Sequence, residues 1–284
     1  MKRILLLVPA LFALTLIAAI WSHNMHQNAI RTPAPLNQVS IPIKEDEATV
    51  AKTSQQNHGV TVNIGVRSRY VGLQGGIFDP GPVIQGSVSK NLGRGFTIEA
   101  WQSFNLQGGS THSFGKETDV ALYYARPIKN FNFNTSVTLI NATPFTEFPK
   151  GDVLQISANI SRTYVLEEHK LTPYVGTRIA TPLTKDGPKF GAFPFAGLTH
   201  DWKPKKAFQG RLGIDTTQEF IWDANGGFGF DQGVISRTQT RFRWQVNRRL
   251  TLFAPELGIT LPITSIKDDR TITPFIGVGV TFNY

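Results

Sequence analysis

Cysteine is absent from the 284 residues of the sequence. Its absence excludes thiolate metal sites, a cysteine nucleophile and a lipid-modified N-terminal cysteine. A chain that crosses an oxidising compartment without cysteine also avoids stray disulfides, which is compatible with export. Charged residues are scarce as well. They make up 17% of the chain, whereas about 25% is usual in soluble domains.

The sequence also lacks any long basic tail or basic helical face, although its formal net charge is +9. Such a charge can indicate nucleic acid, membrane headgroups or anionic solutes as partners. The densest basic groups are short: Lys203, Lys205 and Lys206, and then Arg241, Arg243, Arg248 and Arg249. We therefore expect no nucleic-acid partner.

Only the N-terminus carries an apolar run near 18 residues, so no further transmembrane helix is predicted. Lys2 and Arg3 precede this run, which extends over 4–21. The order is typical of a secretory signal peptide, and its length also allows an uncleaved anchor. We assign 1–22 to a signal peptide or N-terminal anchor. Residues 23–58 show no period and are predicted to be a flexible periplasmic linker or an ordinary disordered N-terminus.

From Val60 onward, apolar and polar residues alternate strictly, as Val60, Val62, Ile64 and Val66 show. Alternation of this kind predicts strands with one apolar and one polar face. Twelve segments share the pattern, and the predicted strands are 60–71, 82–90, 95–105, 117–126, 130–141, 152–165, 170–180, 190–202, 207–220, 233–246, 249–262 and 272–284.

The connections between these segments alternate between short turns and longer loops, which is typical of a transmembrane barrel. The segments are about 9–14 residues long, enough to cross a bilayer at a tilt. Aromatic residues near segment ends predict interfacial girdles: Tyr70, Trp101, Phe104, Tyr164, Trp202, Phe220 and Trp222. The predicted fold is all-β, a transmembrane antiparallel up-and-down barrel of about twelve strands over 59–284. A soluble β-sandwich is the alternative.

The segment 275–284 has apolar residues at alternate positions and ends on an aromatic residue. It resembles the C-terminal signal that bacterial outer-membrane proteins present to the barrel-assembly machinery, in which most chains end on phenylalanine. The resemblance implies that Phe282 and Tyr284 form the assembly signal. It also implies a location in the bacterial outer membrane of a Gram-negative cell envelope.

A second resemblance concerns the first strands of the predicted barrel. The segment 62–71, followed by 82–86, is similar to the opening hairpin of TorF-type porins. The segment 118–124 resembles the acidic and aromatic strand of that group. These patterns cover about half of the barrel. They imply a channel and leave its solute open.

If the apolar row of each strand faces lipid, the other row faces inward. The predicted pore-lining basic residues are Arg67, Arg69, Arg178, Arg211, Arg237, Arg241 and Arg243. The predicted pore-lining acidic residues are Glu99, Glu117, Asp119, Asp215 and Glu219. Glu256 joins them if a β-bulge near Pro255 reconciles Leu252 with Leu257, which have opposite parity.

Opposed charges across a constriction orient and select polar solutes. The sequence therefore predicts a channel for passive diffusion of small polar solutes, anionic or zwitterionic ones among them. The same rows can instead pair and plug a small barrel, so a plugged structural or surface-adhesion barrel stays an alternative. The expected partners are the lipid bilayer, lipopolysaccharide, the barrel-assembly machinery and a small polar solute.

Some outer-membrane barrels are lipases, such as outer-membrane phospholipase A. Such chemistry needs a serine, an activating histidine and a group that orients the histidine. The candidates His112–Ser113 and His200–Asp201 do not resemble the phospholipase motif, so no enzyme is expected and a lipid-modifying hydrolase is the least favoured alternative. No cofactor or metal is expected either. The loop Asp223–Gly227 with Asp231 lacks the spacing and closing glutamate of an EF-hand.

Overall fold

The computed structural model describes residues 59–284 apart from 73–76, 108–116, 142–151, 186–188, 205–206, 228–231 and 264–271. The predicted signal peptide or anchor (1–22) and the predicted linker (23–58) lie outside the described residues. In the described part of the chain, no helix is long and apolar enough to cross a membrane.

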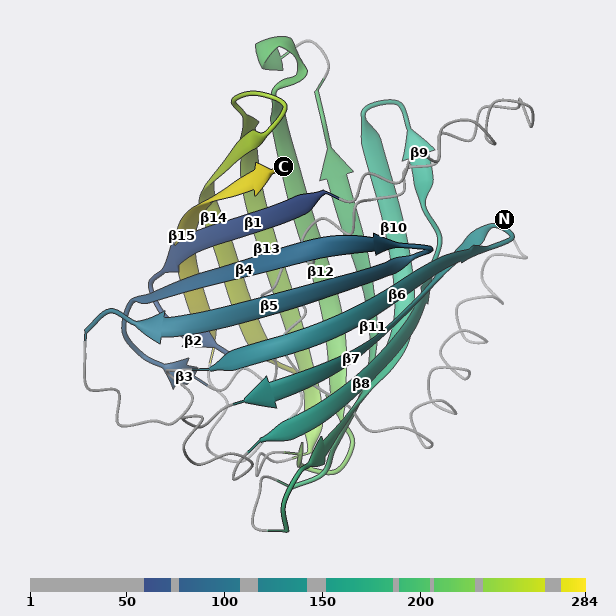
Figure 1. Ribbon diagram of the computed structural model, residues 1–284, viewed down its shortest axis with the longest axis vertical. Coiled ribbons are helices and arrows are strands. Elements are labelled where there is room, and N and C mark those ends of the chain that lie inside the picture. The colour runs from purple at the N-terminus through teal and green to yellow at the C-terminus, as the bar shows by residue number, and fades with distance from the viewer. Residues whose placement is uncertain are drawn as a thin grey trace.

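Twelve antiparallel strands wrap into one closed barrel (Figure 1). The wall consists of β1 (Val60–Arg67), β4 (Val83–Gly93), β5 (Phe96–Asn105), β6 (Thr118–Ile128), β7 (Phe131–Asn141), β8 (Val153–Ser161), β10 (His169–Pro182), β11 (Gly191–Trp202), β12 (Leu212–Asp223), β13 (Gly233–Gln245), β14 (Leu250–Pro262) and β15 (Thr273–Asn283). The short β9 (Tyr164–Leu166) continues β8 after a break, and both pair with β10.

Two pairings close the sheet. β15 pairs with β1, and β10 pairs with β11, so the strand order returns to its start. A closed sheet satisfies its backbone hydrogen bonds without water, which is what a membrane-spanning sheet requires. The predicted twelve-stranded barrel is therefore confirmed.

The burial pattern of the wall is the inverse of that in a soluble protein. On β4, Val88 is 50% exposed, whereas the neighbouring Ser87 and Ser89 are buried. The same holds for outward apolar residues around the barrel: Ile64, Val66, Ile98, Val120, Leu122, Val137, Ile156, Ile160, Leu198, Leu252, Leu257, Ile276 and Val278 are all exposed. Soluble proteins bury such side chains, so the outer face suits lipid hydrocarbon and the soluble-sandwich alternative is wrong.

The expected bulge in β14 is present. The register of β14 shifts between Phe253 and Glu256 against β15, and the register of β13 shifts at the same height between Arg241 and Arg243. The shift turns Glu256 inward while leaving Leu257 outside. The break in the alternation of apolar and polar residues therefore locates the β-bulge from the sequence alone.

The start of the ninth predicted strand is wrong. It was expected at 207, but β12 begins at Leu212 because Ala207–Gly210 forms a short 3-10 turn, η4. Gly210, the last residue of this turn, has a positive φ of 71°, which is incompatible with an extended strand at that point. At its other end, β12 continues to Asp223, beyond the predicted end at 220.

Candidate functional site in the barrel interior

Most of the predicted pore-lining residues face the interior of the barrel. They alternate with exposed apolar residues along the wall strands and comprise Arg67, Arg178, Arg237, Arg241, Arg243, Glu99, Asp119, Asp215 and Glu219. Glu117 precedes β6 and is fully buried. Arg69 and Arg211 lie outside the wall strands, because β1 ends before Arg69 and β12 begins after Arg211, which is exposed.

Glu256 is the centre of the first ion-pair cluster. Its side chain is 1% exposed. Arg67 donates to it twice, from Nε to Oε2 at 2.8 Å and from Nη2 to Oε1 at 2.9 Å. Arg241 Nε lies 3.5 Å from Oε1, and Gln239 Nε2 also donates to this oxygen. A two-pronged guanidinium–carboxylate pair is directional as well as strong, so one carboxylate holds two arginines in place.

Glu219 is the centre of the second cluster. Arg178 Nη2 donates to Glu219 Oε2 at 2.7 Å, and the Tyr174 hydroxyl donates to the same oxygen at 3.3 Å. The Arg178 guanidinium also lies over the Phe195 ring, 3.9 Å from its centroid. Arg237 is opposite Glu219 in the β12–β13 ladder. As with Glu256, two guanidinium groups accompany one carboxylate.

Arg243 forms a third, more exposed cluster. Its Nη2 donates to Asp201 Oδ1 at 2.7 Å, and its Nε forms an ion pair with Asp215. About a third of the Arg243 side chain is accessible, so this cluster is better solvated than the other two. The sequence interpretation considered Asp201 only beside His200 and missed its inward position. Asp201 has the parity of the buried Phe195, and this signal could have identified it.

Two carboxylates lie across the barrel from the arginines of β13. In the ring of twelve strands, β5 and β6 are half a turn away from β12 and β13. Glu99 on β5 and Asp119 on β6 are inward and buried. The Tyr123 hydroxyl donates to Glu99 Oε1 at 3.3 Å. Carboxylates on one wall and guanidinium groups on the other create an electric field across the lumen.

A short hairpin enters the lumen from the rim of long connections. The first predicted strand, 60–71, ends at Arg67, and Tyr70–Val71 forms β2, which pairs with β3 (Ile77–Asp79; Figure 1). Tyr70 packs against Trp101, with ring centroids 5.9 Å apart, and its hydroxyl donates to Glu117 Oε2 at 3.1 Å. The chain leaves the wall here because these aromatic rings bury one another inside the barrel.

The prediction of an interfacial position is therefore wrong for two members of the aromatic girdle. Tyr70 and Trp101 are inside the barrel, at 1% and 6% exposure. Trp101 has the parity of Glu99, which already marks it as inward. By contrast, Tyr164 and Phe220 lie on the outer face and are exposed, as a girdle requires.

The histidines give no support to hydrolase chemistry. His200 Nε2 lies 2.9 Å from His169 Nδ1, and the two rings are stacked, with Trp202 beside them. Asp201 points into the lumen toward Arg243, so it does not orient His200. The other predicted pair, His112–Ser113, lies outside the described residues.

The glycine-containing loop after β12 is stabilised by hydrogen bonds to the Asp223 side chain. Asp223 Oδ1 accepts hydrogen bonds from the backbone N–H groups of Asn225, Gly226 and Gly227, at 3.4, 2.9 and 3.1 Å. This is ordinary Asx-turn geometry. Asp231 lies outside the described residues. Among the described residues, no group of three or more histidine, aspartate or glutamate side chains could hold a metal ion.

The predicted assembly signal lies at the closing seam. Phe282 pairs with Val62, and the Tyr284 N–H donates to Val60 O at 2.9 Å. Phe282 and Tyr284 continue the outward row of the exposed Ile276 and Val278. The seam shows where these residues lie, and their role in assembly stays a prediction.

Comparison with known proteins supports the fold. No protein-family profile matches the chain, and no curated protein matches its sequence. The NanC porin superposes with a TM-score of 0.51 at 8% identity, over 78% of this chain and 98% of the porin. An outer-membrane channel from Pseudomonas putida F1 superposes with a TM-score of 0.50 at 10% identity, over 80% of this chain and 95% of the channel. At such identities the likeness concerns the fold alone, so the resemblance to TorF-type porins stays a prediction.

Proposed function

We propose that the chain forms a channel in the bacterial outer membrane for passive diffusion of small polar solutes, with a preference for anions. The observation that carries the proposal is a closed barrel with an apolar outer face and ionised side chains facing inward. Glu219 and Glu256 are each accompanied by two arginines, whereas Arg243 has two carboxylates, so the five arginines of these clusters exceed the four carboxylates by one positive charge. An excess of this kind attracts anions.

The location and the partners form part of the same proposal. The exposed apolar band requires a lipid bilayer around it, with lipopolysaccharide at the rim of the long connections in an outer membrane. The outward row that ends with Phe282 and Tyr284 would be read by the barrel-assembly machinery. The likeness of the fold to that of solved outer-membrane porins and channels supports this location.

A plugged structural or adhesion barrel is the second candidate. It is favoured by the β2–β3 hairpin, which places Tyr70 and Phe78 inside the lumen. A second apolar cluster contains Phe193, Phe195 and Ile221 at the same rim. Together these groups occupy part of the passage.

Single-channel recording in planar bilayers tests the two candidates, using the refolded full chain after heat-modifiable migration on a gel has shown that it is folded. A channel gives stepwise conductance with a higher permeability for chloride than for potassium. Arg241→Gln should lower that permeability ratio, because it removes one inward positive charge. Lys90→Gln is the matched control, since Lys90 is an exposed, outward residue of β4.

The outcomes separate the candidates. A folded chain without conductance would overturn the channel and favour the plugged barrel. Conductance whose ion preference is the same in Arg241→Gln and Lys90→Gln would retain the channel and refute the role of the arginines.

A further inference from the structure

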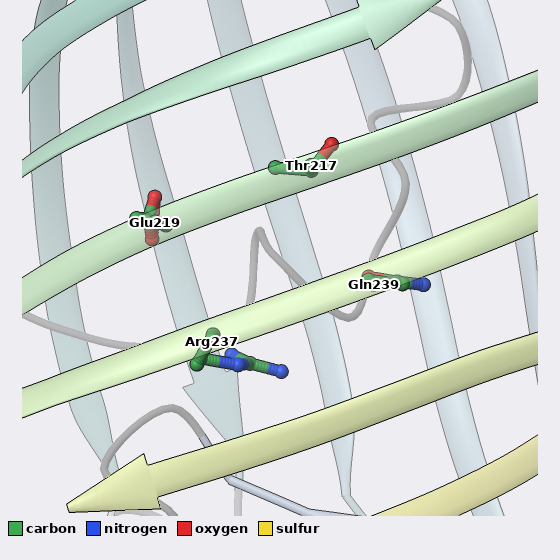
Figure 2. Close-up of a pocket in the computed structure, with 4 residues that line it drawn as sticks. All are labelled: Thr217, Glu219, Arg237 and Gln239. Atoms are coloured by element: carbon green, nitrogen blue, oxygen red, sulfur yellow. The ribbon is translucent and has the colours of Figure 1, made fainter.

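A small cavity lies between β12 and β13 on the inner face of the wall. Its lining residues are Thr217 and Glu219 of β12, and Arg237 and Gln239 of β13 (Figure 2). They form two facing pairs in the ladder, Thr217 with Gln239 and Glu219 with Arg237. The cavity measures about 10 Å³, which is room for roughly one water-sized group. Only a single polar group of a ligand, such as a hydroxyl, fits there, so the rest of the ligand would extend into the lumen.

Polar atoms around this cavity are buried without partners. Arg237 is 5% exposed, and its Nη1 has no hydrogen-bond partner among the described residues. Glu219 Oε1 is also buried without a hydrogen-bond partner among the described residues, although Oε2 accepts hydrogen bonds from Arg178 and Tyr174. Leaving a buried polar atom unpaired is unfavourable, and more so for a charged group. A ligand that pairs with both atoms would remove this cost.

The charges around the cavity define what such a ligand must carry. Arg178 and Arg237 supply two positive charges, and Glu219 supplies one negative charge. The excess of one positive charge matches one monoanion. Arg178 is held by Glu219 through Nη2 and by the Phe195 ring, and its Nε and Nη1 also have no partner among the described residues. Arg237 is the guanidinium group that lines the cavity, so it is the one placed to meet a ligand there. Guanidinium groups bind carboxylates with matched geometry.

The free oxygen of Glu219 adds a second requirement. An ionised carboxylate only accepts hydrogen bonds, so the ligand must present a donor to Oε1. A hydroxyl group beside the ligand carboxylate provides this donor and leaves the net charge of the ligand at minus one. An ammonium group would also donate, but it would cancel the negative charge that the site needs.

We propose that Arg237 and Glu219 form a binding site for small hydroxycarboxylates, with the carboxylate on Arg237 and the hydroxyl on Glu219. The site deepens the proposed channel function, because it names the solute class, and it rests on that function only for the role of the ligand as a transported solute. Binding itself needs no conduction.

Isothermal titration calorimetry of the refolded full chain in detergent tests the site with three ligands of one skeleton: lactate, propionate and alanine. Lactate should bind about tenfold or more tightly than propionate, because a hydrogen bond to a charged group is lost. Alanine should bind more weakly than lactate. Equal affinities for lactate and propionate, or tighter binding of alanine, would overturn the proposal.

Two variants assign the roles. Arg237→Gln should abolish binding of lactate and propionate alike, whereas Glu219→Gln should reduce the ratio between them toward one. Arg249→Gln, a change of the same kind at an exposed turn, is the matched control and should bind as the unaltered chain does. If a variant fails to show heat-modifiable migration, the three-ligand comparison on the unaltered chain still decides.

Bilayer recording of the same preparation separates this proposal from the channel. A chain that conducts but does not distinguish lactate from propionate overturns the site and leaves the channel standing. A chain that binds lactate as expected but does not conduct upholds the site and overturns the channel.

Discussion

Replacing Glu256 by glutamine tests whether the ion pairs inside the barrel behave as buried ones. The carboxylate is 1% exposed and accepts two hydrogen bonds from Arg67, while Arg241 lies 3.5 Å away. Glutamine keeps the shape and removes the charge, so two guanidinium groups lose their shared counterion. Breaking a buried pair in this way costs about 3–5 kcal/mol. We expect the free energy of unfolding to fall by that amount.

The assay is equilibrium unfolding in guanidinium chloride, followed by tryptophan fluorescence of the refolded full chain in detergent micelles. Asp201→Asn is the matched control, because it removes a carboxylate from the more exposed Arg243 cluster, where Asp215 remains as a partner. Exposed pairs contribute about 0–1 kcal/mol. If Glu256→Gln costs no more than Asp201→Asn, the lumen is hydrated enough to screen both clusters and the reasoning from burial is refuted.

Three further changes probe other parts of the barrel. Tyr70→Phe removes the hydrogen bond to Glu117, which contributes about 0.5–1.5 kcal/mol. It should raise the mean single-channel conductance, because the β2–β3 hairpin leaves the lumen more often. Unchanged conductance would contradict this. Gly258→Ala places a methyl group against the Phe275 ring and should lower the free energy of unfolding by about 1–3 kcal/mol, and an unchanged denaturation midpoint would count against it. Phe282→Ser should reduce the heat-modifiable fraction in cell envelopes while refolding in detergent proceeds as before; equal losses in both would indicate a folding defect instead.

The strands were predictable because one physical rule governs each of them. A wall with lipid on one side and a polar lumen on the other forces strict alternation, and a break in parity marks a bulge, as at Glu256. The first strand shows where this rule fails. Alternation continues through Arg69 to Val71, so the sequence predicts a strand to 71, whereas the chain turns inward after Arg67. The cause is burial of Tyr70 against Trp101, a contact between residues far apart in sequence.

The partners inside the lumen were less predictable than the inward positions. Arg67 and Glu256 are 189 positions apart in the sequence and lie on strands separated by β15. Parity shows that each faces inward, but the height at which they meet depends on the shear of the closed sheet. Arg178 and Glu219 are likewise separated by β11. The inward-facing charged residues can therefore be predicted from the sequence, whereas the ion pairs they form depend on the three-dimensional geometry of the closed barrel.

The pairing also decides which charges are available to a solute. Arg67 and Arg178 are each fixed by at least one carboxylate, so their guanidinium groups are held in position and partly neutralised. Arg237 lies opposite Glu219 in the β12–β13 ladder, and its Nη1 has no hydrogen-bond partner among the described residues. Its buried charge is thus less fully compensated than that of Arg67 or Arg178, which favours selection of an anion rather than stabilisation of the wall alone. Selectivity should accordingly depend on Arg237 more than on any arginine that already has a carboxylate partner.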